Sequence, residues 1–229
     1  MQAWLKRLTP GEALMAVILV LGLGVGLHVR RPPAEPVSAP APAPAVQDVS
    51  VMFDAALLRH TIGDAGFVVV KLVDFECPIC KQFEVAEGAR LRALAESGRI
   101  TLATVHMPLN IHPQAVTLAV SAECAGEQGQ FWEAHDYLLH PYDALASPEG
   151  APRPVLDADA LAACRADPAT EERVRADAEL ALASGARPAT PAFYLGTRHA
   201  DGSVRATALT SAASVMAEIE RRIGMAPVL

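Results

Sequence analysis

The chain has 229 residues, of which 52% are hydrophobic and 20% are charged, and its formal net charge at pH 7 is −7. This length leaves room for one or two domains, and the apolar fraction is large enough to fill a sizeable core. An acidic chain is a poor ligand for polyphosphates, so we expect no nucleic-acid partner.

Residues 13–29 form an apolar stretch of 17 residues, with Lys6 and Arg7 before it and Arg30 and Arg31 after it. This length is near the lower limit for crossing a bilayer. A cleaved signal peptide would carry small residues after its apolar core instead of two arginines. We therefore expect residues 1–29 to be an uncleaved membrane anchor, with a cleaved signal segment as the alternative.

Residues 30–46 are dominated by Pro and Ala and contain a single acidic residue, Glu35. Such a composition cannot form a core and favours an extended polyproline conformation, at roughly 3.1 Å per residue. We expect a stiff linker here, followed by one folded domain over residues 47–229.

The centre of this domain is a strand that runs into two cysteines. The segment Val68–Phe75, just after Gly66, is rich in Val and predicts a buried strand, and the motif Cys-Pro-Ile-Cys follows at residues 77–80. Pro78 suits the first position of a helix, because its missing N–H would be unpaired there anyway. Cys77 then lies at a helix N-terminus, which favours a thiolate, and we predict that it is the nucleophile. Cys80, on the same helix face, is the predicted resolving thiol.

Other uses of Cys77 and Cys80 are less consistent with the sequence. A zinc site would need two further ligands, and His135 and His140 lie far beyond the usual separation from Cys80. A covalently bound haem would need a histidine where Lys81 stands. Buried structural cysteines remain an alternative, although the strand-to-helix context favours redox chemistry. We expect no metal and no cofactor beyond a Cys77–Cys80 disulfide.

Further elements follow the motif in alternation. We expect its helix to end near Ser97-Gly98, followed by a strand at Ile100–Val105 and by a helical insertion at about residues 111–187. Breaks containing Gly or Pro divide this insertion into four helices, Ala115–Ala125, Phe131–Leu139, Asp157–Arg165 and Thr170–Ser184. Two strands and a last helix are predicted after it, at Ala192–Leu195, Val204–Leu209 and Ser211–Ile223.

Several of these segments resemble one family. The stretch Asp74-Phe75-Glu76-Cys77-Pro78-Ile79-Cys80, together with Ala189-Thr190-Pro191-Ala192-Phe193-Tyr194, resembles the DsbA-like branch of the thioredoxin superfamily. His112-Pro113-Gln114-Ala115 and the segment 122–132 resemble its helical insertion, so the resemblance covers roughly residues 55–225. It implies an α/β thioredoxin fold, a central mixed sheet flanked by helices, with an inserted helical subdomain. It also implies a thiol-disulfide oxidoreductase that acts on exported proteins.

The resemblance also implies roles for three residues near the cysteines. Pro191 is expected to be a cis proline opposite them, where the backbone of Thr190 pairs with an extended substrate chain. An ordinary trans proline at the start of an edge strand is the alternative. Ile79 is expected to contact substrate through packing alone. Because strongly oxidising members of the family carry a histidine at that position, we expect a less extreme oxidant than the most oxidising DsbA, whose potential is about −120 mV.

Lys71 departs from the family pattern, in which a buried acidic group often stands six residues before the nucleophile. Two interpretations remain open. If Lys71 points toward Cys80, burial would lower its proton affinity and allow it to accept a proton. Alternatively, its ammonium reaches water from the strand end and has no catalytic role.

Cys124 and Cys164 fall in the first and third helices of the insertion. Some relatives in the family carry a second disulfide, and an oxidising compartment would allow one here. An even number of cysteines permits this pairing without specifying it. We expect a structural disulfide, with two buried free thiols as the alternative.

The residues and the resemblance together predict a single-pass protein of the bacterial inner membrane, with its domain in the periplasm or outside the cell. A soluble periplasmic form would result from signal cleavage. Its substrates would be protein thiols and disulfides, and its oxidant a quinone-linked membrane partner of the DsbB kind. A disulfide reductase or isomerase, for example in cytochrome c maturation, is one alternative. A peptide-binding chaperone with an incidental dithiol is another.

Overall fold

The computed structural model describes residues 50–140, 153–209 and 214–225. The predicted anchor at residues 13–29 and the linker at residues 30–46 lie outside these ranges. Within them, no helix combines the length and the apolar character needed to cross a bilayer.

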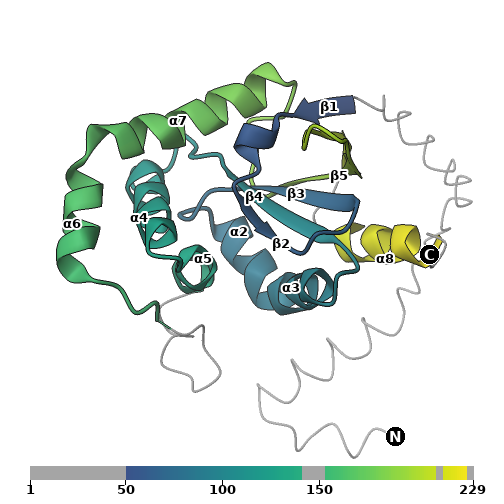
Figure 1. Ribbon diagram of the computed structural model, residues 1–229, viewed down its shortest axis with the longest axis horizontal. Coiled ribbons are helices and arrows are strands. Elements are labelled where there is room, and N and C mark those ends of the chain that lie inside the picture. Colours follow the sequence, from purple (N-terminus) through teal and green to yellow (C-terminus); the bar gives the residue numbers. More distant parts are fainter. Residues whose placement is uncertain (1–49, 141–152, 210–213, 226–229) are drawn as a thin grey trace, which may run out of the picture. The chain divides into compact units, whose positions relative to one another are not determined.

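A six-stranded mixed sheet forms the centre of the domain (Figure 1). Its order is β1 (Ser50–Phe53), β6 (Val204–Ala208), β5 (Ala192–Arg198), β3 (Phe67–Val73), β4 (Thr101–His106) and β2 (His60–Ile62). β3 pairs in parallel with β4 and antiparallel with β5, and β1, β6 and β2 are joined to the sheet by antiparallel pairing. The mixed sheet predicted from the sequence is therefore confirmed.

Side chains of β3 are buried on both faces of the sheet, as its continuous apolar run predicts. Val68, Val70 and Leu72 join one apolar cluster, whereas Val69 joins the cluster on the opposite face. Because side chains alternate along a strand, Lys71 lies on the same face as Val69. The strand therefore directs one lysine into the interior of the protein.

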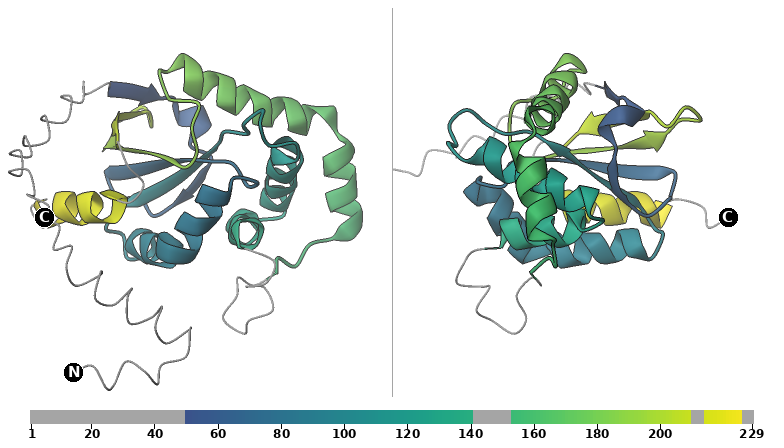
Figure 2. Two further views of the ribbon diagram at one scale, coloured as in Figure 1. Left: turned by 180° about the vertical axis from the view of Figure 1, so that it is seen from behind. Right: turned by 60° about the vertical axis from the view of Figure 1, so that its left-hand side comes forward.

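Helices cover both faces of the sheet (Figures 1 and 2). The dithiol segment continues as one helical stretch made of α2 (Pro78–Phe83), a π-helical turn η3 (Glu84–Gly88) and α3 (Ala89–Glu96). α3 and the C-terminal helix α8 (Val215–Met225) lie on the face of Val69. α7 (Pro168–Ala183) and the short helix η2 (Ala55–Leu57) cover the other face.

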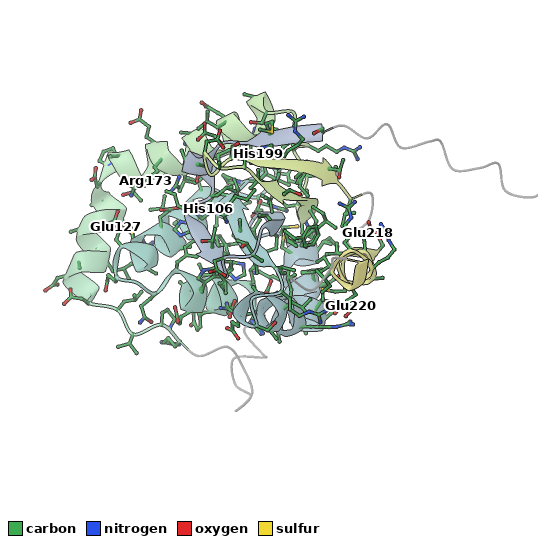
Figure 3. The ribbon with its side chains drawn as sticks, turned by 45° about the vertical axis from the view of Figure 1, so that its right-hand side comes forward. His106, Glu127, Arg173, His199, Glu218 and Glu220 are labelled. Atoms are coloured by element: carbon green, nitrogen blue, oxygen red, sulfur yellow. A yellow bond between two sulfur atoms is a disulfide. The ribbon has the colours of Figure 1, made fainter. Side chains whose placement is uncertain are left out.

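The predicted insertion forms α4 (Ala115–Glu127), α5 (Phe131–Leu139), α6 (Ala158–Ala166) and α7, all within three residues of the expected bounds. α4 packs against the other three helices, and its apolar side chains share a cluster with Phe75, Cys77 and Cys80. Ion pairs such as Arg173–Glu127 join α4 and α7 at the surface, as Figure 3 illustrates. The insertion therefore packs directly against the cysteines.

A disulfide joins Cys124 of α4 to Cys164 of α6, the pairing expected from the sequence. It closes a loop with a sequence separation of 40, and Cys124 is fully buried. Closing a loop of this length restricts the unfolded chain, by about 4 kcal/mol in the chain-entropy description.

Replacing both Cys124 and Cys164 by Ala is therefore expected to lower the free energy of unfolding by about 2 to 4 kcal/mol, measured by urea denaturation. Non-reducing digestion and mass spectrometry should recover the linked peptides from the wild type. The matched control is the Cys77→Ser/Cys80→Ser variant, which should retain the linked peptides. Free thiols at both positions in protein purified from an oxidising compartment would contradict the assignment.

Candidate active site

Cys77 lies at the N-terminus of α2, where the strand-to-helix motif predicts it. Its backbone N–H donates to the carbonyl oxygen of Asp74 at 3.1 Å, and its own carbonyl accepts from the N–H of Lys81 at 3.2 Å. Pro78 occupies the first turn of the helix, where no hydrogen bond is lost through its missing N–H. Cys77 and Cys80 are both free thiols and almost fully buried.

The two sulfur atoms differ strongly in acidity. A hydrogen bond from the Cys80 thiol, with help from the N–H groups at the helix start, lowers the pKa of Cys77 from 9.0 to about 5. The same hydrogen bond and burial raise the pKa of Cys80. At neutral pH, Cys77 is therefore a thiolate and Cys80 a thiol, the division of roles expected for a nucleophile and a resolving thiol.

Thr190 and Pro191 lie beside the nucleophile, although they are more than 110 positions away in the sequence. The Thr190–Pro191 peptide bond is cis, and the Cys77 thiol is 3.4 Å from the carbonyl oxygen of Thr190. Pro191 immediately precedes β5, so the pairing of β5 with β3 brings it to the dithiol. Ile79 is 49% exposed, and with Val85 it leaves apolar surface on the dithiol helix.

The environment of Lys71 matches neither of the two interpretations that the sequence left open. Its side chain is only 2% exposed, so the ammonium does not reach water. Nζ donates to Oε2 of Glu84 and to Nε2 of His135, each at 2.9 Å. Among the described residues these are its hydrogen bonds, and none is to Cys80. Lys71 therefore neutralises a buried carboxylate behind the dithiol helix.

This ion pair continues toward the surface through α5. Nδ1 of His135 lies 2.8 Å from Asp136, which also accepts a hydrogen bond from Arg92. Burial and Lys71 lower the pKa of His135, so its neutral ring accepts at Nε2 and donates at Nδ1. Burial opposes ionisation of Glu84, but the charge and hydrogen bond of Lys71, together with His135, outweigh it and lower the pKa of Glu84.

A second buried cluster lies between the sheet and the insertion. Oε1 of Glu123 is 2.7 Å from Nε2 of His60 and 2.8 Å from Nε2 of His106, and it also accepts a hydrogen bond from Arg59. Burial opposes ionisation of Glu123, but the histidine hydrogen bonds outweigh it and lower its pKa. Arg59 also pairs with Asp177 of α7, which links the sheet to the helical insertion.

Two groups in the described residues offer three potential metal ligands each, His60/His106/Glu123 and Glu84/His135/Asp136. In both groups a cationic side chain already binds at least one of the coordinating atoms. Arg59 binds Glu123 in the first, and Lys71 binds Glu84 and His135 in the second. A metal ion would have to displace the guanidinium of Arg59 from Glu123 or the buried ammonium of Lys71 from Glu84 and His135, so we assign no metal to either group.

A third polar contact joins the dithiol loop to the segment between β4 and α4. Oδ2 of the buried Asp74 carboxylate accepts from the N–H of Leu109 at 2.9 Å and lies 2.7 Å from Nδ1 of His112. Its other oxygen accepts from the N–H of Glu76 at 2.8 Å. The sequence placed Asp74 and His112 in family-like motifs but gave neither a role. The signal available for both was an ionisable residue within a motif that resembles the family.

The acidity of Cys77 predicts how the reduced protein reacts with iodoacetamide. Because the thiolate is the reacting species, the alkylation rate should change little between pH 8 and about 6 and fall by half near the Cys77 pKa, about 5. Cys80 should stay unmodified in the folded protein, and the Cys77→Ser variant provides the control. An alkylation midpoint near 9.0, the ordinary value, would contradict the site geometry.

Replacing Lys71 by Met removes the ammonium while keeping the length of the side chain. The expected loss is about 3 to 5 kcal/mol of unfolding free energy at pH 7, because Glu84 is left charged and buried without a partner. The pKa of Glu84 is lowered in the folded protein, so the pair stabilises the fold above the unfolded-state pKa of Glu84. The difference between wild type and variant should therefore shrink as the pH falls through the acidic range.

Urea denaturation at several pH values measures this effect. Lys81→Met, at a partly exposed lysine, is the matched control and should change stability by less than about 0.5 kcal/mol. Adding Glu84→Gln to Lys71→Met should recover part of the loss. If Lys71→Met left turnover and the Cys77 titration unchanged per folded molecule, a catalytic role for Lys71 would be wrong.

Comparison with known proteins agrees with this geometry. A family model described as thioredoxin, Thioredoxin_4, matches residues 59–213. The Na(+)/H(+) antiporter NhaA 1 of Salinispora arenicola is 38% identical over 159 residues, covering 65% of this chain and 23% of the relative. NhaA 3 of Salinispora tropica is 36% identical over 156 residues, with the same two coverages. The chain spans about a quarter of the length of these curated relatives.

Solved structures share the fold at low sequence identity. DsbA2 of Pseudomonas aeruginosa has a TM-score of 0.53 at 24% identity, covering 71% of this chain and 92% of that one. Alpha-DsbA1 of Wolbachia pipientis has a TM-score of 0.56 at 17% identity, covering 72% of this chain and 90% of that one. BdbD of Bacillus subtilis has a TM-score of 0.53 at 19% identity, covering 72% of this chain and 92% of that one. These structures show that the chain shares the fold of DsbA-like proteins, and the family match shows that it belongs to the thioredoxin family.

Proposed function

We propose that the chain is a thiol-disulfide oxidoreductase that exchanges disulfides with exported proteins through Cys77 and Cys80. The observation that carries the proposal is the asymmetry of the two sulfurs. Cys77, at a helix start, has a lowered pKa and is a thiolate, whereas Cys80, three residues later, is a thiol with a raised pKa. Both lie beside the cis proline segment. This asymmetry assigns attack to one sulfur and resolution to the other.

In the oxidising direction, the reaction begins with a Cys77–Cys80 disulfide. A substrate thiolate attacks the Cys77 sulfur, the bond between the cysteines breaks, and Cys80 leaves as a thiolate that takes up a proton. A second substrate thiolate then attacks the substrate sulfur of the mixed disulfide and releases Cys77 as a thiolate. Two electrons pass from the substrate to the protein, and the substrate leaves with one new disulfide.

The low pKa of Cys77 favours this direction. A stabilised thiolate lowers the energy of the reduced protein, which makes the disulfide a stronger oxidant. In a reductase or isomerase the same residues carry out the reverse reaction, so the redox partners determine the net direction of electron transfer. Extended substrates would lie along the cis proline segment, where the backbone of Thr190 faces Cys77, with Ile79 packing on apolar side chains.

The proposed site of action is the outer face of a bacterial inner membrane, with residues 13–29 as the anchor and residues 30–46 as the spacer. Two features support a membrane association. The stretch 13–29 is apolar and nearly long enough to cross a bilayer. The curated relatives are named Na(+)/H(+) antiporters, and 65% of this chain matches about a quarter of their length. A quinone-linked partner of the DsbB kind would reoxidise the dithiol.

Cysteine variants test the proposal with a dithiol peptide as substrate. Cys77→Ser should lose at least about a thousandfold in dithiol oxidation and in insulin reduction, because no attacking or leaving sulfur remains at position 77. With insulin as the disulfide substrate, Cys80→Ser should instead accumulate a mixed disulfide, because the Cys77 thiolate attacks an insulin disulfide and releases one insulin thiolate, but no resolving thiol follows; mass spectrometry detects the adduct. A peptide-binding chaperone would retain its function in both variants, and retention would overturn the proposal.

Alkylation of thiols in intact cells distinguishes an oxidant from a reductant. An oxidant should be recovered mainly with Cys77 and Cys80 joined, because its partner keeps it oxidised, whereas a reductant should be recovered as the dithiol. The Cys124→Ala/Cys164→Ala variant simplifies the analysis by leaving one cysteine pair. Recovery of the dithiol would favour the reductase alternative.

A further inference from the structure

Hydrogen bonds join the loop between β4 and α4 to the dithiol loop at two residues just before Cys77. Leu109 and His112 bind the Asp74 carboxylate, as described above, and the N–H of Gln114 donates to Oε2 of Glu76 at 2.5 Å. Asp74 and Glu76 are three residues and one residue before Cys77. Three hydrogen bonds therefore fix the position of His112 relative to the Cys77 backbone.

The charges around His112 favour its protonated form. The hydrogen bond to Asp74 raises the pKa of His112, and the charges of Cys77 and Glu76 raise it further. The imidazole is 16% exposed, and the Asp74 side chain that holds it is fully buried. The titratable groups that raise the pKa of His112 most are Asp74, Cys77 and Glu76, which are all anionic and come from the dithiol loop itself.

We propose that His112, held as an imidazolium by Asp74, is a positioning residue that favours the thiolate form of Cys77. Coupling between two charges is reciprocal, so an imidazolium stabilised by the thiolate stabilises the thiolate by the same free energy. Ile79 offers no donor to the sulfur, and the cation is supplied from a separate loop. The inference deepens the proposed function, because the ionised sulfur is the group that function uses.

This arrangement affects the redox balance of the protein. When two electrons from a substrate dithiol break the Cys77–Cys80 bond, Cys80 takes up a proton and Cys77 remains a thiolate near the imidazolium. The reduced state gains this attraction and the disulfide state does not. The disulfide is therefore a stronger oxidant than the Cys-Pro-Ile-Cys motif alone would make it.

The wild-type protein provides the first test. The His112 imidazole is titrated by NMR in the dithiol form and in the Cys77–Cys80 disulfide form. We expect the pKa of His112 to fall on oxidation, because the thiolate that stabilises the imidazolium is lost. His199, exposed on the connection between β5 and β6, is the internal control and should not change (Figure 3). An unchanged His112 titration would overturn the inference.

Variants test the effect on Cys77 itself. His112→Gln should raise the pKa of Cys77 by about 0.5 to 1 unit and lower the equilibrium constant for oxidation of glutathione by about three- to tenfold. His112→Lys retains a cation and should stay near the wild type in both measurements. His199→Gln is the matched control and should change neither.

Equal shifts in His112→Gln and His112→Lys would indicate a packing role and overturn the inference. The wild-type NMR titration decides the question even if a variant fails to fold. Failure of the proposed function has a different signature: the wild type would not exchange disulfides with a peptide, while the Cys77 titration would still respond to His112→Gln.

Discussion

Backbone pairing of β3 with β4 on one side and with β5 on the other determines what surrounds the Cys77 sulfur. The parallel partner β4 ends at the same edge as β3, so its following loop carries His112 toward the dithiol. The antiparallel partner β5 begins at that edge, so the residues before it bring Thr190 and Pro191 to the same place. Three segments that are far apart in the sequence therefore meet at one strand end.

The interior behind the dithiol helix contains a lysine where the family often has an acid. A buried ammonium is stable only if a carboxylate and other acceptors surround it, and Glu84 and His135 meet this requirement for Lys71. The π-helical turn η3 contributes to the arrangement, since a Cβ on Gly88 would collide with the Glu84 carboxylate. The lysine, its acid and this glycine thus form one unit, and changing any of them alone leaves the others poorly accommodated.

Features that depend on neighbouring residues could be predicted from the sequence. The correct elements were predicted for the apolar run 68–73, the Cys-Pro-Ile-Cys motif and the insertion helices, because the signals for these elements come from residues close together in the sequence. β1 and β2 were not predicted, since strands of four and three residues are too short to show a pattern. The contact of Lys71 with His135 could not be predicted, because His135 lies 64 positions away on helix α5. Nor could the contact of His112 with Asp74, which depends on how β4 is placed beside β3.

The two cysteine pairs also differ in what can reach them. Cys77 contacts the carbonyl of Thr190 beside the exposed Ile79, whereas the sulfur of Cys124 is enclosed by apolar side chains of the insertion. A reductant can attack the second disulfide only at the partly buried Cys164, and Cys124 would then have to leave as a thiolate in a fully buried, apolar site, which makes it a poor leaving group. The folded protein should consequently behave as a two-electron carrier despite its four cysteines, and its second disulfide should survive each catalytic cycle untouched.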